Sequence, residues 1–381
     1  MDNVYLSHNN IVSSLGFDST TVIDSIEKGN CGLSVYEDNK VLHVPFCSSR
    51  IAPKELQKRY ENLNPNTEHT RLEKMMLVSL ADTLEKKSKI GLDERTGLLI
   101  STTKGNIDVL EEDSNFAESR AYLAELGEQV QKFFGFKNKA IIVSNACVSG
   151  VLSIAVAKRL IKQGRYDRIL VVAGDLVTQF ILSGFNAFQA LSLEPCRPYC
   201  NSRTGINIGE VAASVLVTKN PKELAPESVQ IMGEASCNDA NHISGPSRTG
   251  EGLYRSIENA LGQSGVRKKD IDYISGHGTA TMFNDEMEAI AFERAGLSKT
   301  PVNSLKSYFG HTLGASGLLE SIIGMHSLHR NTLFASLGFE ELGVSRPMNI
   351  IKKTTNKELN VFLKTASGFG GSNTAVIFKK V

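Results

Sequence analysis

The sequence contains no tryptophan, and only 7% of its residues are aromatic. This scarcity argues against an aromatic cage or a lectin-like binding surface. An excess of charge of one sign is also missing, because 42 lysines and arginines balance 41 aspartates and glutamates to a formal net charge of +1. Together with 41% hydrophobic residues, this balance argues against a disordered chain and against a strongly basic nucleic-acid-binding protein.

Long apolar runs are absent as well. No window approaches the roughly 18 uninterrupted apolar residues of a membrane span, and the opening MDNVYLSHNN lacks the pattern of a signal peptide. We therefore expect no membrane span and a cytoplasmic location. The cysteines are few and scattered, which favours reduced thiols over a disulfide framework. They lie at positions 31, 47, 147, 196, 200 and 237.

Glycine, in contrast, is frequent at 32 residues while proline is scarce at 10, a balance typical of many tight turns between strands and helices. Short β-branched runs alternate with helical patterns in both halves of the chain. This alternation predicts an α/β fold with helices covering the sheets. Predicted strands span residues 96–103, 140–144, 168–175, 211–219, 229–236, 271–275, 302–305, 361–365 and 374–379, and predicted helices span 151–162, 252–263 and 318–329.

Two segments suggest a coarse internal duplication. AIIVSNACVSGVLSIA and PVNSLKSYFGHTLGASGLLES each combine a strand, a polar turn and a glycine-rich helix start. The segment NPKELAPE at 220–227 separates them and is the best candidate for a linker, so we expect one half at residues 1–220 and another at 228–381. The polar stretch that begins at Cys31 has no sustained periodicity, which predicts an inserted cap over about residues 31–95.

Cys147 is the first candidate for a reactive side chain, because it lies in SNACVSG between a predicted strand and an apolar helix. A thiol at a helix N-terminus experiences the positive end of the helix dipole, which lowers its pKa and favours the thiolate. The small neighbours Ala146, Ser149 and Gly150 leave room for an acyl chain. A buried packing cysteine is the alternative, since this is the most common fate of a free cysteine.

Two histidines and a lysine lie in similar turns of the second half. His277 stands between two glycines in ISGHGTATMFND, directly after a predicted strand, and His311 follows Lys306 in LKSYFGHTLGASG. Either histidine alone would more often be a structural residue. Active sites of open α/β folds, however, collect at the carboxyl ends of strands, so we expect these turns and the Cys147 turn to meet.

A cysteine with two histidines and a lysine favours acyl transfer through a thioester. The thiolate accepts the acyl group, and neutral imidazoles donate hydrogen bonds to a carbonyl oxygen that becomes an enolate. A cysteine protease has no comparable need for the second histidine and the lysine, and a zinc site is disfavoured because Cys196-x3-Cys200 has no companion pair. Near the C-terminus, SGFGGSN taken alone favours an ordinary hairpin-like connection, with a turn gated by Phe369 and a backbone nest that binds phosphate as the alternatives.

Taken in order, several motifs resemble the β-ketoacyl-acyl-carrier-protein synthases of the elongating Cys-His-His type, which are thiolase-fold condensing enzymes. The motifs are NNIVSSLG, SNACVSG, CRPYCNSRTGINIGE, GHGTATMFNDEME, NSLKSYFGHTLGASG and SGFGGSN, and they span nearly the whole chain. The resemblance implies an α/β, thiolase-like fold in which two pseudo-duplicated βαβαβαββ halves form a layered α/β/α/β/α core. It also implies condensation in fatty-acid, polyketide or polyene chain elongation.

The resemblance further assigns catalytic roles. Cys147 is implied to accept the acyl group from a carrier-protein thioester before decarboxylative Claisen condensation with a malonyl-carrier protein. His277 and His311 are implied to stabilise the enolate as carbon dioxide leaves, with Lys306 supporting His311. The backbone N–H groups of Cys147 and Phe369 match the family's oxyanion hole, and Phe369 matches its gating phenylalanine.

The remaining site residues also come from the resemblance. Thr279 and Thr281 match hydroxyls that bind the phosphopantetheine arm, while Asp285 and Glu288 match acidic residues that order the Lys306 region. No metal or organic cofactor is implied, because the phosphopantetheine belongs to the carrier protein. A thiolase would have a second cysteine in the SGFGGSN turn, and an initiating synthase would have Asn in place of His311.

The implied partners are an acyl carrier protein and a second subunit, giving a homodimer or a heterodimer with a related ketosynthase-like chain. One candidate for carrier docking is the basic helix after Cys147, although a solvated helix face is the more common reading of such charges. The chain departs from the family at Asn145, where Thr is usual, and it is shorter across residues 31–96. The alternative function is a poorly active or chain-length-determining subunit, which the retained Cys147 makes the minority reading. The docking candidate comprises Lys158, Arg159, Lys162 and Arg165.

Overall fold

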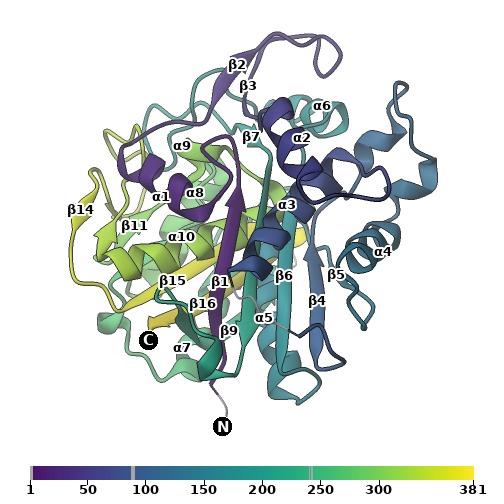
Figure 1. Ribbon diagram of the computed structural model, residues 1–381. Helices are drawn as coiled ribbons and strands as arrows, with labels where there is room; N and C mark the ends of the chain where they lie inside the picture. The colour runs from purple at the N-terminus through teal and green to yellow at the C-terminus, as the bar shows by residue number, and fades with distance from the viewer. Residues whose placement is uncertain (1–2, 87–90, 240, 242) are drawn as a thin grey trace.

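The computed structural model describes residues 3–86, 91–239, 241 and 243–381, which fold around a mixed sheet covered by helices (Figure 1). An 11-stranded sheet runs through this part of the chain. In sheet order its strands are β13 (Asn349–Ile350), β11 (Pro301–Asn303), β10 (Tyr273–Ser275), β15 (Val361–Gly368), β16 (Ser372–Lys380), β9 (Val229–Asn238), β1 (Tyr5–Val12), β8 (Val211–Thr218), β6 (Arg168–Asp175), β4 (Thr96–Ser101) and β5 (Ile141–Val143).

The strand order repeats within this sheet. Apart from the two-residue edge strand β13, the first half runs β5-β4-β6-β8-β1 from the edge to the centre of the sheet, and the second half runs β11-β10-β15-β16-β9. When the five strands of each half are numbered in chain order, the third strand lies farthest from the centre of the sheet and the first strand lies at the centre in both halves. The halves join where β1 pairs with β9, through the pairs Tyr5–Gln230 and Leu6–Val229. The topology therefore has the duplication that the two similar sequence segments predict.

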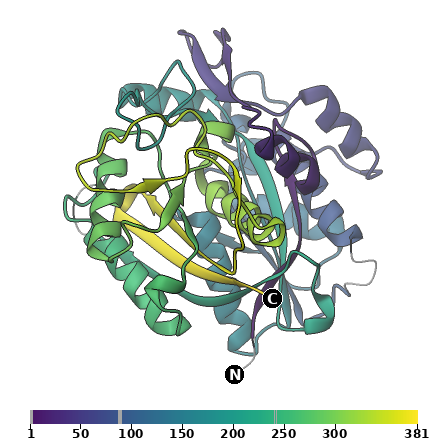
Figure 2. The same cartoon turned by 90° about the vertical axis from the view of Figure 1, so that its left-hand side faces the viewer.

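Helices fill the space between the halves and cover the outer faces. α5 (Ser149–Lys162) and α10 (Ser316–Arg330) contact each other and strands of both halves. α3 (Arg71–Glu85) covers β8, β1 and β6, while α7 (Glu251–Ser264) covers β9 and β16. In Figure 2 the light-green α10 lies between the yellow strands of the second half and the purple and teal strands of the first. These layers confirm the α/β/α/β/α core that the resemblance implies.

The two inner helices begin with the same dipeptide, Ser-Gly, and the glycines permit their close approach. A Cβ atom on Gly150 would lie 2.6 Å from the backbone nitrogen of Leu318, and one on Gly317 would lie 2.5 Å from that of Val151. Any side chain at either glycine would therefore push the helices apart. Val151, Leu318 and their neighbours are fully buried in the largest apolar cluster, whose removal from water stabilises the joined halves.

The predicted cap over about residues 31–95 is too broad. Its first part does lie outside the duplicated units, but α3 occupies the same place between the first and second strands of its half that α7 occupies in the other. The periodicity was obscured because α3 buries polar side chains, Glu73, Ser79 and Thr83, among its apolar ones. The outer elements of this region are β2 (Ser34–Tyr36), β3 (Phe46–Ser49) and α2 (Pro53–Glu61), and β3 pairs with β7 (Ile208–Gly209).

The position of α5 in the layers also corrects part of the prediction that its basic residues form a docking surface. α5 lies between the halves, so Lys158 is buried, with Nζ 3.2 Å from the carbonyl oxygen of Met232. Arg159 is paired with Glu234 at 2.5 Å. Lys158 is therefore no part of a docking surface, whereas Arg159, although paired, is exposed to solvent, as are Lys162 and Arg165.

The turns that follow four strands converge on one region. β5 leads to Cys147, β10 to His277, β11 to Lys306 and His311, and β15 to Phe369. No helix in the described residues combines the length and apolarity required to cross a bilayer. The other elements include α1 (Ser19–Glu27), α4 (Leu123–Phe134), α6 (Gln179–Ala187), α8 (Met282–Arg294), α9 (Lys306–Phe309), β12 (Thr332–Leu333) and β14 (Thr355–Asn356).

Candidate active site

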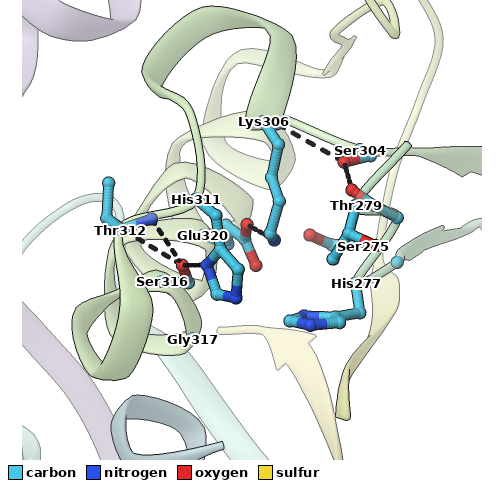
Figure 3. A network of polar contacts seen from close by, with 12 residues as sticks. Ser275, His277, Thr279, Ser304, Lys306, His311, Thr312, Ser316, Gly317 and Glu320 are labelled. Atoms are coloured by element: carbon cyan, nitrogen blue, oxygen red, sulfur yellow. Dashed lines mark hydrogen bonds and ion pairs between the residues drawn. The ribbon is translucent and has the colours of Figure 1, made fainter. Parts of the chain in front are cut away.

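A cavity of about 320 Å³ lies where the strand ends meet. Among its lining residues are six that the sequence singled out, and they come from both halves of the chain. Lys306 is not part of the lining; Figure 3 shows it next to Glu320, in the same polar network as His277 and His311. The six predicted lining residues are Cys147, His277, Thr279, Thr281, His311 and Phe369.

Cys147 lies on a strained turn just before α5. The preceding Ala146 has φ +43°, an unusual left-handed conformation for a residue with a side chain. The turn is held by Ser149, whose Oγ accepts a hydrogen bond from Asn145 N at 2.7 Å. The strand β15 ends against it, because a Cβ atom on Gly368 would lie 3.0 Å from Cys147 N. The Phe369 N–H group consequently donates to the Cys147 thiol.

The pKa of the Cys147 thiol differs from the one expected from the sequence. Burial raises the pKa of Cys147 to about 11, although Lys306 and the Phe369 N–H group act in the opposite direction. The argument from the helix N-terminus predicts a lowered pKa, but loss of hydration outweighs that favourable field at a fully buried sulfur. The resting side chain is therefore a neutral thiol, which must lose its proton as it attacks.

The hydrogen bonds around His311 fix its tautomer. The N–H group of Leu313 donates to His311 Nδ1 at 3.1 Å, so this nitrogen is an acceptor. Ser316 Oγ lies 2.9 Å from the same nitrogen, and its hydroxyl supplies a second donor. In the neutral ring the proton must then reside on Nε2. Nε2 has no partner among the described residues, so its N–H group is available to a ligand in the cavity.

His277 is placed by two buried carboxylates on α8. Glu288 accepts from His277 N at 2.7 Å and from Gly278 N at 2.6 Å, and Asp285 accepts from Thr279 N at 2.9 Å. Asp285 also accepts from Tyr199 N at 2.7 Å. The resemblance implies that these carboxylates order the Lys306 region. In the structure they instead accept hydrogen bonds from the His277 turn and from Tyr199.

The partner of Lys306 is a residue that the sequence analysis missed. Lys306 Nζ lies 2.7 Å from Glu320 Oε1, and both side chains are buried. Lys364 is a second missed residue, because its Nζ lies 2.6 Å from Glu320 Oε2. The available signal was a single charge inside an apolar element: Glu320 in SGLLESIIGM and Lys364 in VFLKTAS.

Both imidazoles are kept neutral. Burial holds the pKa of His277 well below its usual value, and Lys306, His311 and Lys364 lower it further. Burial likewise lowers the pKa of His311, again with Lys306 and Lys364 contributing. At neutral pH the two rings are uncharged and can donate or accept hydrogen bonds. The two rings lie edge to face with their centroids 5.1 Å apart.

Hydroxyl groups and aromatic rings complete the cavity. Thr279 Oγ1 and Thr281 Oγ1 lie 2.7 Å apart on one wall. Phe369 stacks on Phe185 with ring centroids 6.0 Å apart and meets Phe188 edge to face at 5.8 Å. The sequence analysis missed both partners of Phe369, although FNAFQA carries them on one short helix segment.

Cys147, His277 and His311 each offer one ligand-type atom, and these atoms lie within 4.8 Å of one another. This proximity also satisfies a first condition for a metal site. We assign the three groups to proton and hydrogen-bond chemistry, because the charges of Lys306 and Lys364 act on the same rings and oppose a cation. The arrangement suits a nucleophile with an electrophilic pair of imidazoles.

Comparison with known proteins gives a consistent result. The curated relatives include 3-oxoacyl-[acyl-carrier-protein] synthase 2 of Rhizobium meliloti (strain 1021), 34% identical over 255 residues that cover 62% of this chain and 60% of the relative. The matched region thus spans less than two thirds of that relative. A second relative, 3-oxoacyl-[acyl-carrier-protein] synthase 1 of Buchnera aphidicola, is 27% identical over 410 residues and is covered completely, as is this chain.

Solved structures share the fold at lower identity. A ketosynthase (ApeO) in complex with its chain length factor (ApeC) from Xenorhabdus doucetiae has a TM-score of 0.88 at 24% identity, covering 100% of this chain and 98% of that one. The ishigamide ketosynthase/chain length factor has a TM-score of 0.87 at 21% identity, with 100% and 99% covered. Family models match on both sides of the linker: the N-terminal domain of β-ketoacyl synthases at residues 56–222 and the C-terminal domain at 229–340. The chain belongs to the β-ketoacyl synthase family.

Proposed function

We propose that this chain is a β-ketoacyl-acyl-carrier-protein synthase, an acyltransferase that elongates a fatty-acid or polyketide chain. The observation that carries the proposal is the convergence of Cys147, His277 and His311 within 4.8 Å inside one cavity. The names of its relatives support the same reaction, since they are 3-oxoacyl-[acyl-carrier-protein] synthases.

The first step is transfer of an acyl group from a carrier-protein thioester to Cys147. The thiol proton passes to a ring nitrogen of His277, because His311 Nε2 already carries its own proton. The carbonyl oxygen of the tetrahedral intermediate is stabilised by the backbone N–H groups of Cys147 and Phe369. Collapse of that intermediate releases the carrier thiol, which takes up the proton.

The second step is decarboxylation of a malonyl-carrier protein. The carbon–carbon bond to the carboxylate breaks, and its electron pair forms an enolate as carbon dioxide leaves. The enolate oxygen receives hydrogen bonds from His277 and from His311 Nε2–H, and Thr279 and Thr281 hold the phosphopantetheine arm. The enolate carbon then attacks the Cys147 thioester, the carbon–sulfur bond to Cys147 breaks, and the departing thiolate takes up one proton from solvent to restore the thiol.

The residues in the cavity supply the hydrogen bonds in this scheme and solvent supplies the one proton that it consumes, so we propose that the enzyme needs neither a metal nor an organic cofactor. An acyl carrier protein is the substrate-bearing partner. We also propose a dimer with an identical or related subunit. Two solved relatives support this, because they are described as a ketosynthase with its chain length factor. A cytoplasmic location belongs to the same proposal, since the enzyme must share a compartment with its carrier protein.

The test is to incubate the purified protein with an acyl-carrier protein and measure its intact mass. An acyl adduct on Cys147, followed by carbon dioxide release and a 3-oxoacyl product when malonyl-carrier protein is added, is the expected result. An adduct that forms only on an added second ketosynthase-like chain, and never on this chain, would instead assign this chain to the chain-length-determining role. Release of free acid without malonyl-dependent carbon dioxide would identify a hydrolase.

A further inference from the structure

Behind the two imidazoles, two buried lysines share a single carboxylate. Lys306 contacts one oxygen of Glu320 at 2.7 Å, and Lys364 contacts the other at 2.6 Å. The second contact is an ion pair that lacks hydrogen-bond geometry, because Glu320 Oε2 has no hydrogen-bond partner among the described residues. Lys306 already neutralises Glu320, so Lys364 is one cation more than this carboxylate requires.

The hydrogen bonds of Lys364 go to the end of a neighbouring strand. Lys364 lies opposite Ser275 in the parallel pair β10–β15, and its Nζ donates to the carbonyl oxygens of Ser275 and Gly276 at 3.1 Å each. These are the two residues immediately before His277. Ser275 is the last residue of β10 and Gly276 follows it, so Lys364 supplies donors where the ladder ends, and a buried carbonyl without a donor is costly.

Lys364 also lies on β15, the strand that leads directly to the gating residue Phe369. The strand continues through Ser367 to Gly368, whose close approach to Cys147 N places Phe369 beside the thiol. A single ammonium group thus contacts the His277 strand and Glu320 while belonging to the strand that carries the gate. The side chain is completely buried, so it cannot move to solvent without opening this junction.

We propose that Lys364 is a positioning residue for the decarboxylation step, because it fixes the start of the His277 turn and shares Glu320 with Lys306. The proposal rests on the function proposed above. Lys364 contacts no substrate-lining surface, since it is absent from the lining of the cavity. It acts on the reaction through His277 and His311, and the acylation of Cys147 depends on it less.

The charge of Lys364 should make the proposed role visible in the pH dependence of decarboxylation. Burial lowers the pKa of Lys364 itself and Glu320 opposes this effect; in its protonated form Lys364 lowers the pKa of both His277 and His311, in the same direction as burial and Lys306. Removal of this charge raises both pKa values, so the rings become protonated at a higher pH. The charged or titratable groups around the two rings and their turns are Cys147 before α5, Asp175 on β6, Tyr199, Asp285 and Glu288 on α8, Lys306 on α9, Glu320 on α10 and Lys364 on β15.

The experiment compares Lys364→Met, Lys364→Gln and Lys364→Arg with the wild-type protein. Lys379→Met is the matched control, because Lys379 lies on the same hairpin but is exposed to solvent. Two rates are measured across pH: formation of the acyl adduct on Cys147, and malonyl-dependent release of carbon dioxide. Circular dichroism verifies that each variant is folded.

Lys364→Met is expected to lower carbon dioxide release by about tenfold or more, as for a buried polar group left unpaired, and to change acylation by less. In Lys364→Met the acid side of the pH–rate profile for decarboxylation shifts to higher pH, whereas Lys364→Arg keeps the wild-type profile. Should Lys364→Met fail to fold, Lys364→Gln keeps an N–H donor on a shorter, uncharged side chain, and must show the same shift.

Two outcomes would overturn the proposal. One is a pH profile of Lys364→Met or Lys364→Gln that parallels the wild-type profile, since a purely structural defect lowers the rate equally at every pH. The other is an equal shift in Lys379→Met, which would indicate a general effect of net charge. Failure of the wild-type protein to acylate or to release carbon dioxide would refute the proposed function instead, so the two failures are distinguishable.

Discussion

The turn that carries Cys147 and the turn that follows His311 have nearly the same backbone but opposite chemistry. In the first, Asn145 N donates to Ser149 Oγ at 2.7 Å; in the second, Thr312 N donates to Ser316 Oγ at 3.0 Å. Each has a left-handed residue three positions before its serine, Ala146 at φ +43° and Leu313 at φ +51°. The duplicated fold thus supplies the same strained support twice.

The difference lies in which position of the turn is reactive. Two residues before its serine the first turn has Cys147, and the second has Gly314. A Cβ atom on Gly314 would lie 2.9 Å from Asp175 Oδ2 and 3.0 Å from Thr103 N, so a side chain there has no room. The second turn instead presents His311 from the residue before it, and its left-handed Leu313 supplies the N–H group that fixes the tautomer. One support therefore positions a nucleophile and the other a hydrogen-bond donor.

Replacement of Cys147 with alanine makes the first turn as unreactive as the second, and has the largest expected effect. No acyl adduct or condensation product forms, because no other group in the cavity can hold the acyl chain as a thioester. Malonyl decarboxylation continues, since His277 and His311 remain. Intact mass and carbon dioxide release measure the two steps. Cys237→Ala, on β9, is the control and keeps both activities; an adduct on Cys147→Ala would place the nucleophile elsewhere.

His311→Ala tests the other turn. We expect acylation of Cys147 to persist, while decarboxylation slows by about 10²–10³-fold, as when one donor to an oxyanion is removed. The comparison requires the two variants to fail at different steps. Turnover equal to the wild-type rate would exclude His311 from the mechanism.

The pH dependence of thiol alkylation follows from the pKa of Cys147, which burial raises to about 11. Because this folded-state pKa lies above the ordinary value, the thiolate fraction rises about tenfold per pH unit through neutral and mildly alkaline pH. Iodoacetamide alkylation, followed by mass spectrometry of the Cys147 peptide, should show no plateau up to about pH 9. A plateau near neutrality would mean that the helix N-terminus prevails over burial.

Ser149 and Ser316, which hold the two turns, allow a direct comparison with a smaller expected effect. Ser316→Ala removes a donor to His311 Nδ1 and should slow decarboxylation about fivefold, equivalent to the loss of one hydrogen bond of about 1 kcal/mol. Ser149→Ala should slow acylation by a similar factor and leave decarboxylation intact. Single-turnover rates of the two steps provide the measurement, and the same defect in both variants would contradict separate roles for the turns.

The smallest effect is expected at Asn145, whose Oδ1 accepts from Ser372 Oγ at 3.0 Å. This bond ties the first turn to the strand after the Phe369 gate and has no counterpart at Thr312, whose hydroxyl contacts Ser316. Asn145→Ala should slow acylation by about two- to fivefold. Ser372→Ala serves as its partner in a double-mutant cycle, and additive effects of the two changes would show that the bond contributes nothing.

Much of the site could be predicted because its residues follow strands in recognisable turns. The glycines around His277 and His311, and the small residues around Cys147, are local requirements of those turns and are therefore visible in a single sequence. Glu320 and Lys364 could not be placed in this way. Each is one charge in an apolar element, and only the packing of α10 against β15 shows that they meet.

The sequence by itself determined the alternation of strands and helices, the duplicated turns and the identity of the reactive side chains, because these depend on residues close together in the chain. The tertiary structure decided the rest. It placed α3 in the sheet layers, buried Lys158 of α5 between the halves, and raised the pKa of a thiol whose local position favours a thiolate. Burial and electrostatic neighbours depend on segments far apart in the sequence, so local patterns do not reveal them.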